Sequence, residues 1–141
     1  MIAVDTNILV YAHREESDWH EPAARAVRGL AEGVTAWAIP WPCVHEFLAI
    51  ATHARIFRTP TPVAAALDQV DAWLESPSLV TLAEDDDYWT TLRTLVAEAR
   101  LDGPRVHDAR VAALCLRHAV RELWTADRDF ARFPGVRVKN P

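Results

Sequence analysis

The sequence predicts an α/β fold: a single domain, residues 1–141, in which helices cover a mainly parallel sheet of about five strands. Three observations support this prediction. Short apolar runs without alternation, such as Ile2–Val4, are typical of parallel strands that are buried on both faces. Stretches with helical periodicity separate these runs, which favours strand–helix–strand crossovers. The chain has 141 residues, 50% of them hydrophobic, which suffices for one core and leaves little for a second domain.

The elements follow from hydrophobic periodicity and from the residues that begin and end helices. The predicted strands are Ile2–Val4, Val34–Ile39, Leu79–Leu82, Glu122–Thr125 and Val136–Val138. The predicted helices are Ile8–His13, a segment from Asp18 to Gly33, Cys43–Ala54, Val63–Leu74, Asp87–Arg100 and a segment from Pro104 to about His118. Asp18–Glu21 resembles a capping box. The acidic run Glu84–Asp87 is interpreted as the solvated start of a helix.

Composition narrows the class of protein. The net charge of -5 argues against a protein held on nucleic acid by a global basic field, although cations bound at an acidic site would reverse the charge locally. Cys43 and Cys115 lie in apolar stretches, so we expect reduced core residues of a cytoplasmic protein. No apolar run approaches the roughly 20 residues of a membrane span, and the N-terminus lacks the pattern of a signal peptide.

Two acidic residues follow predicted strands. Asp5 comes directly after the first strand, and Asp127 comes just after Thr125. Parallel sheets bind ligands at the carboxyl ends of their strands, so both carboxylates are expected at the functional edge. Each also has a purely structural interpretation as a helix cap. Asp129 competes with Asp127 as a candidate ligand.

Two further acidic residues lie in predicted helices. The helix that contains Asp108 is expected to begin near Pro104, which places this carboxylate within the helix, on the apolar face of Val111 and Cys115. Glu46 lies on a similar stripe in an earlier helix. A carboxylate on a buried face is unfavourable unless it is paired or binds a metal. The alternative for both residues is an interaction with the helix dipole, or with an arginine in the case of Asp108.

Together the four carboxylates indicate a site for Mg²⁺ or Mn²⁺, which prefer oxygen ligands. No cysteine or histidine cluster has the spacing of a zinc site. His45 and His107 each precede a candidate ligand and point about 100° away from it on a helix. We interpret both histidines as structural residues or as supports of the ligands.

Several phosphate-handling classes are excluded by what the chain lacks. The only lysine is Lys139, whereas P-loop NTPases and phospho-receiver domains need a lysine at the phosphate. Asn7 stands where haloacid-dehalogenase-like phosphotransferases usually have a second aspartate. The glycines form no dinucleotide-binding fingerprint.

Four segments carry a family resemblance. They are Asp5-Thr6-Asn7-Ile8-Leu9-Val10-Tyr11-Ala12, Val44-His45-Glu46-Phe47, Val106-His107-Asp108-Ala109-Arg110-Val111-Ala112-Ala113 and Leu123-Trp124-Thr125-Ala126-Asp127-Arg128-Asp129-Phe130. In this order they resemble the acidic motifs of PIN-domain proteins, across the whole chain. A single PIN domain of this length is most similar to the VapC toxins of toxin–antitoxin pairs.

The resemblance implies a three-layer α/β/α fold, RNA cleavage that depends on Mg²⁺ or Mn²⁺, a homodimer, and inhibition by a small VapB-type antitoxin. Asp5, Glu46, Asp108 and Asp127 become metal ligands or their immediate supports, and either Asp127 or Asp129 completes the site. Thr6 and Thr125 become supporting hydroxyls.

No histidine or lysine is an obvious general base, so the chemistry is assigned to one or two metal ions. Four arginines near the expected edge are candidates to grip the RNA backbone: Arg14, Arg105, Arg110 and Arg128. The alternatives are a PIN module that binds RNA or protein without cleavage, and a metal-dependent phosphatase of small molecules.

The predicted helix Val63–Leu74 carries an apolar stripe that has two interpretations. Its members are Val63, Leu67, Val70 and Leu74. The stripe either covers the sheet or forms a dimer contact, as the family resemblance implies.

Overall fold

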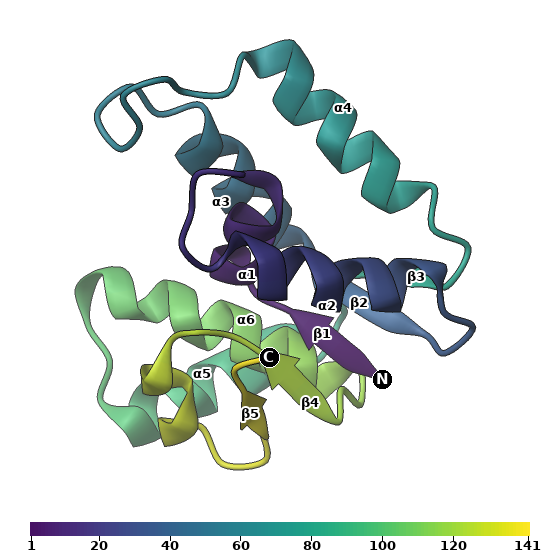
Figure 1. The fold of residues 1–141 in the computed structure, drawn as a ribbon. Coiled ribbons are helices and arrows are strands. Elements are labelled where there is room, and N and C mark those ends of the chain that lie inside the picture. The colour runs from purple at the N-terminus through teal and green to yellow at the C-terminus, as the bar shows by residue number, and fades with distance from the viewer.

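A computed structural model describes all residues, 1–141, and shows a sheet of five parallel strands with helices on both faces (Figure 1). The strand order is β3-β2-β1-β4-β5. The strands are β1 (Ile2–Val4), β2 (Trp37–Pro40), β3 (Leu79–Leu82), β4 (Glu122–Trp124) and β5 (Val138–Lys139). The predicted α/β fold is therefore confirmed, and every strand pair is parallel.

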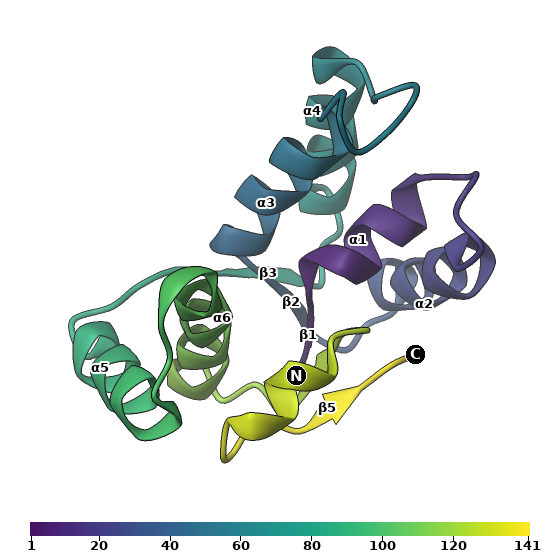
Figure 2. The same ribbon diagram turned by 90° about the vertical axis from the view of Figure 1, so that its left-hand side faces the viewer.

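Six α-helices connect and cover the strands. They are α1 (Thr6–His13), α2 (His20–Glu32), α3 (Trp41–Ala51), α4 (Val63–Leu74), α5 (Tyr88–Ala99) and α6 (Val106–Arg117). The helices α1 and α2 lie on one face of the sheet and α5 and α6 on the other, while α3 and α4 project beyond it (Figure 2). None of the helices has the length and hydrophobicity needed to cross a bilayer.

The order in which strands are added to the sheet reverses at β1. The first three strands step outward from β1, and the chain then crosses to the other side of β1 to form β4 and β5. Right-handed crossovers in opposite directions place their helices on opposite faces, as observed. Residue Val4 at the end of β1 is in register with Trp124 at the end of β4. The residues that follow both strands therefore meet at a topological switch point, where sheets of this kind bind ligands.

One continuous core joins the two helical layers to the sheet. It contains 29 buried hydrophobic residues, and the largest of the fully buried side chains are Trp37, Phe47, Phe130 and Phe133. Cys43 and Cys115 are both buried and free, as the sequence predicted. The rings of Phe47 and Trp73 lie 4.8 Å apart and pack α4 against α3.

Several predicted boundaries are wrong. The capping box at Asp18–Glu21 does not form, because α2 begins after Trp19 with no side-chain cap, and Pro22 lies in its first turn. The second strand begins at Trp37 and not at Val34, whose side chain is fully exposed. The third helix begins at Trp41 and not at Cys43, because Pro40 ends β2 and α3 follows it at once.

The start of α6 also differs from the prediction. A 3-10 turn, Gly103–Arg105, precedes it, so the α-helix begins at Val106 and Asp108 lies in its first turn. The left-handed backbone of Gly103, with φ of 56°, opens this turn. Asp108 is therefore brought to the end of the helix that faces the sheet edge.

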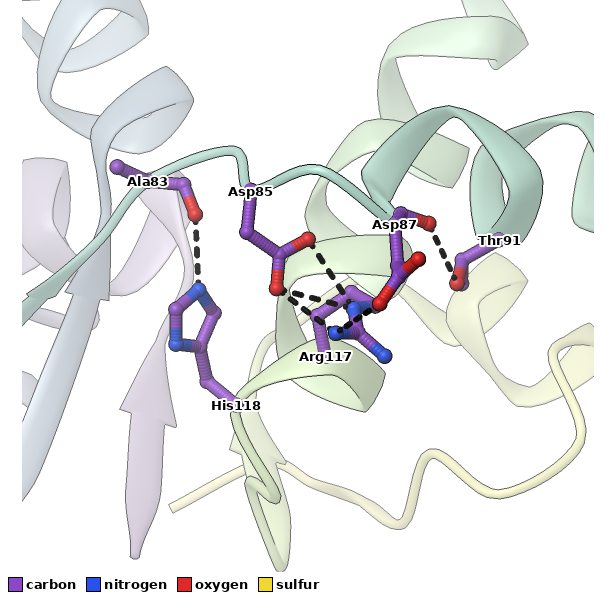
Figure 3. Close-up of polar contacts among 6 residues, drawn as sticks. All are labelled: Ala83, Asp85, Asp87, Thr91, Arg117 and His118. Atoms are coloured by element: carbon purple, nitrogen blue, oxygen red, sulfur yellow. Dashed lines mark hydrogen bonds and ion pairs between the residues drawn. The ribbon is translucent and has the colours of Figure 1, made fainter.

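The acidic run before α5 is exposed and serves as a structural tie. The Arg117 guanidinium at the end of α6 binds Asp85 at 2.9 Å and Asp87 at 3.3 Å (Figure 3). The neighbouring His118 ring contacts the carbonyl oxygen of Ala83 at 2.8 Å. These contacts fasten the start of α5 to the end of α6, away from the switch point.

Candidate metal centre

Asp5 lies at the centre of the switch point, directly after β1. Its backbone N–H donates to the carbonyl of Trp124 at 3.0 Å, which continues the sheet by one residue. Its side chain is only 6% exposed and caps α1 by accepting from the backbone N–H of Thr6 at 2.8 Å. The structural interpretation as a helix cap is thus correct, and it still leaves the carboxylate at the carboxyl edge of the sheet.

Three side chains also donate to the Asp5 carboxylate. The Thr125 hydroxyl donates to Oδ2 at 2.7 Å, and the Asn7 amide donates to the same oxygen at 3.2 Å. The thiol of Cys43 donates to Oδ1 at 3.5 Å. Burial raises the pKa of Asp5, and the hydrogen bonds from Thr125 and Thr6 oppose this shift. The donors therefore fix the carboxylate in one orientation.

Asn7 is a residue whose role the sequence analysis missed. Its amide donates to Thr125 Oγ1 at 3.0 Å, and its side-chain oxygen accepts from the backbone N–H of Ala126 at 3.0 Å. Thr125 Oγ1 in turn accepts from the N–H of Asp127 at 3.0 Å. Asn7 and Thr125 thus join the ends of β1 and β4. The Asp-x-Asn spacing after a strand is the sequence signal that identifies this role.

The four predicted carboxylates line one cavity of about 110 Å³. Asp5, Glu46, Asp108 and Asp127 reach it from β1, α3, α6 and the loop after β4, respectively. Thr6 lies between two of them, because its hydroxyl donates to Glu46 at 3.3 Å while its N–H binds Asp5. Thr6 and Thr125 therefore both contact candidate ligands.

Glu46 and Asp108 are less buried than the apolar-face argument predicted. Glu46 is exposed at the mouth of the cavity, and Asp108 is half-buried, although Val111, Ala112 and Cys115 behind it are buried. The reason is that both carboxylates lie in N-terminal parts of their helices, which open toward the cavity. They are positioned for contact with a solvent-accessible ligand.

The structure places the two competing candidates, Asp127 and Asp129, in different environments. Asp127 lines the cavity and caps the 3-10 helix Arg128–Arg132 by accepting from the N–H of Asp129 at 2.8 Å. Asp129 is exposed, lies outside the cavity lining and pairs with Arg132 at 3.8 Å. Asp127 is thus in the better position to complete the site.

The electrostatics of the cluster favour a cation. Partial desolvation, Asp127 and Asp5 raise the pKa of Asp108 from 3.8 to about 6. Desolvation and the charge of Asp5 also raise the pKa of Glu46. Several carboxylates repel one another here, and a divalent cation would relieve the repulsion. No group of three or more His, Cys, Asp or Glu side chains is arranged as a ready-made cage.

Such an open arrangement fits Mg²⁺ better than zinc. Magnesium keeps several of its waters and is commonly held by one or two carboxylates together with phosphate oxygens of the substrate. The donor set of oxygen ligands therefore suits Mg²⁺ or Mn²⁺.

The four candidate arginines do not share one place. Arg105 and Arg110 line a groove of about 540 Å³ with Glu46 and Asp108. Arg14 is engaged elsewhere, since it donates to Thr61 at 3.0 Å and its guanidinium lies 4.1 Å from the centre of the Phe57 ring. Arg128 is exposed and lines neither the cavity nor the groove. The structure thus brings only two of the four to the carboxylates.

Comparison with known proteins decides the family. The family model described as the PIN domain matches residues 2–136. The chain belongs to the PIN-domain family. The four candidate carboxylates of this PIN domain line one cavity at the switch point.

The relatives of this PIN domain include named ribonucleases. It is 33% identical to "VapC ribonuclease Mb2897" of Mycobacterium bovis over 100% of this chain and 95% of the relative. It is also 33% identical to "Ribonuclease VapC37" of Mycobacterium tuberculosis, over 100% of this chain and 97% of the relative.

Solved structures share the fold at lower identity. VapC20 of Mycobacterium tuberculosis, described as a "Sarcin-Ricin loop cleaving toxin", has a TM-score of 0.68 at 19% identity and covers 97% of this chain and 99% of its own. A VapBC2 structure from Rickettsia felis, bound to a promoter DNA fragment, has a TM-score of 0.66 at 20% identity. The match covers 99% of this chain and 98% of that one.

Proposed function

We propose that this protein is an endoribonuclease that hydrolyses RNA phosphodiester bonds with Mg²⁺ or Mn²⁺ bound by Asp5, Glu46, Asp108 and Asp127. The observation that carries the proposal is the convergence of these carboxylates, from four separate chain segments, on one cavity at the switch point of the sheet. The ribonuclease names of full-length relatives support it.

Each carboxylate has a defined part in this proposal. Asp5, held by four donors, is the fixed ligand around which the site is built. The pKa of Asp108 is raised to about 6, so a cation that binds there would displace the proton that this carboxyl otherwise holds. Glu46 and Asp127 complete the donor set from the rim.

When bound, the divalent cation supplies charge stabilisation at the phosphate and a nucleophile at neutral pH. The protein supplies the remaining requirements. The carboxylates orient the water that attacks the phosphorus, and Arg105 and Arg110 in the adjoining groove hold the RNA backbone. His107 positions Arg110, since its Nδ1 lies 3.1 Å from the guanidinium.

The relatives also lead us to propose a toxin that is bound by a small VapB-type antitoxin and acts as a homodimer. Structures of VapB–VapC pairs share this fold over nearly the full chain. The dimer contact is assigned to α4, where Val63, Leu67 and Leu74 are 62%, 48% and 41% exposed. These side chains form an exposed apolar face, whereas the opposite side of α4 packs against the core.

The test is incubation of the purified protein with labelled RNA in the presence of Mg²⁺ or of EDTA. We expect cleavage with Mg²⁺ only, and no hydrolysis of small phosphoesters under the same conditions. Hydrolysis of small phosphoesters without RNA cleavage would support a phosphatase instead. RNA binding without cleavage at any metal concentration would support a non-cleaving PIN module.

A further inference from the structure

A groove larger than the carboxylate cavity opens beside it, between the N-terminal turns of α3 and α6. Glu46, His107 and Asp108 line both the groove and the cavity, so the two are continuous. A further hollow of about 220 Å³ shares His45 and Arg110 with the groove and extends it toward Trp41. A ligand in the groove would therefore lie directly beside the carboxylates.

His45 lines both the groove and this further hollow, and its ring stacks on the ring of Trp41. The two ring centres are 6.3 Å apart and their planes are 26° from parallel. Trp41 is half-buried and packs against the core, whereas His45 is exposed. The tryptophan therefore supports the imidazole, which is exposed where the groove and the further hollow meet.

Two guanidinium groups line the hollows beside the stacked rings. Arg110 lines both hollows and contacts His107 at 3.1 Å, and Arg105 lines the groove at the start of α6. Guanidinium groups hold phosphate by paired hydrogen bonds. Proteins bind single-stranded nucleic acid by combining aromatic rings, on which bases stack, with cationic groups that hold the phosphates.

We propose that this groove holds one unpaired nucleotide of the RNA next to the cleaved bond, with its base stacked on His45 and its phosphate against Arg105 and Arg110. The proposal rests on the ribonuclease function above and adds a position at which an unpaired base beside the cleaved bond would bind, the ring of His45. A base in a duplex is stacked between its neighbours and cannot lie on a protein ring, whereas a base in a loop can.

The test compares two variants that separate stacking from polar contact. His45→Phe keeps a flat ring without nitrogen donors, and His45→Gln keeps a polar group without a ring. Binding of fluorescent oligoadenylate is measured by anisotropy in the Asp108→Asn background, and an oligomer of abasic riboses of equal length serves as the control probe. The melting temperature of each variant confirms that it is folded.

We expect His45→Phe to retain the affinity for oligoadenylate and His45→Gln to lose about tenfold or more, within the range of base stacking on aromatic rings. The abasic oligomer should bind both variants equally. Pairing the oligoadenylate with its complement should abolish the difference. Retained affinity in His45→Gln, or loss in His45→Phe, would overturn base stacking at this position.

The outcome is separable from that of the proposed function. If the wild-type protein cleaves RNA while the two His45 variants bind alike, the ribonuclease stands and the base site is wrong. If the wild-type protein neither cleaves nor binds RNA, the function itself is wrong.

Discussion

Asp5 ends a strand, caps a helix and faces the cavity, and all three roles follow from its place after β1. A carboxylate in such a position needs donors, and Thr125, Asn7, Cys43 and the N–H of Thr6 supply them. These contacts restrict the carboxylate to one orientation before any ligand arrives. Preorganised residues of this kind are what a metal site requires around its ligands.

Thr125 is the most informative of these supports, because its side chain is 1% exposed and its hydroxyl contacts three groups. Thr125→Val keeps the shape and removes the hydroxyl, which leaves Asn7 and the N–H of Asp127 without that partner. We expect a loss of about 1–3 kcal/mol in the free energy of unfolding and about 10–100-fold weaker Mn²⁺ binding. Denaturant unfolding and calorimetry measure the two effects.

The matched control is Thr125→Ser, which retains the hydroxyl and should retain most of the metal affinity. Equal metal affinity in the valine and wild-type proteins would show that the hydroxyl does not orient Asp5.

The raised pKa of Asp108 predicts a pH-dependent stability. The folded protein retains a proton on Asp108 that the unfolded chain releases between pH 3.8 and about 6, so folding stability falls as the pH rises through this window. The side chain of the Asp108→Asn variant cannot ionise, so the variant does not lose folding stability in this pH window. Without metal, above pH 6, the variant should therefore melt at a higher temperature than the wild-type protein.

With a divalent cation bound, the wild-type protein should instead melt at a higher temperature than Asp108→Asn. Mn²⁺ should raise the melting temperature of the wild-type protein more at pH 8 than at pH 5, because protons compete with the cation. The exposed Asp129→Asn variant is the control and should follow the wild-type profile. Equal Mn²⁺ shifts at both pH values in the wild-type protein would contradict a carboxylate site.

At the scale of elements, the strands and helices were predictable where periodicity was strong and not where local geometry decided. Val63–Leu74 and Leu79–Leu82 were predicted with the observed bounds. The start of α6 was not, because the left-handed turn at Gly103 produces a 3-10 segment that hydrophobic spacing cannot reveal. The partner of the acidic run, Arg117, lies 30 residues or more away and is likewise invisible to local patterns.

The helix α4 illustrates how a stripe can mislead. Its four spaced apolar residues do not share one environment, since Val70 is 8% exposed whereas Leu67 is 48% exposed. Ala66, Val70 and Trp73 form the face that packs inward. The stripe therefore does not simply cover the sheet, and Val70 does not belong to a surface contact.

This division gives a prediction for the homodimer. Leu67→Asp should leave the free energy of unfolding within about 0.5 kcal/mol of the wild-type value, as is usual for surface substitutions, and should yield folded monomers. Val70→Asp is the matched control and should unfold the protein, because it places a charge in the core. Sedimentation at micromolar concentration and circular dichroism distinguish these results. A monomeric wild-type protein, or a dimeric Leu67→Asp variant, would exclude this interface.

At the scale of the whole molecule, the site is a consequence of topology. The four carboxylates are spread along the chain, and the reversal of the strand order at β1 brings them together: Asp5, Glu46, Asp108 and Asp127. The sequence could place each carboxylate at a strand end or helix start, and the family resemblance supplied their order. It could not show that Arg14 lies elsewhere or that His45 stacks on Trp41, because both depend on tertiary packing.

The most direct test is the rate of RNA cleavage as a function of Mn²⁺ concentration for the wild-type protein, Asp108→Asn and Asp127→Asn, with Asp129→Asn as the control. A lost ligand removes charge stabilisation that a bound metal provides, so the first two variants should be slower by about a hundredfold or more while remaining folded. Asp129→Asn should cleave at the wild-type rate. Full activity of Asp108→Asn and Asp127→Asn, or undiminished cleavage by the wild-type protein in EDTA, would contradict the carboxylate site as the centre of catalysis.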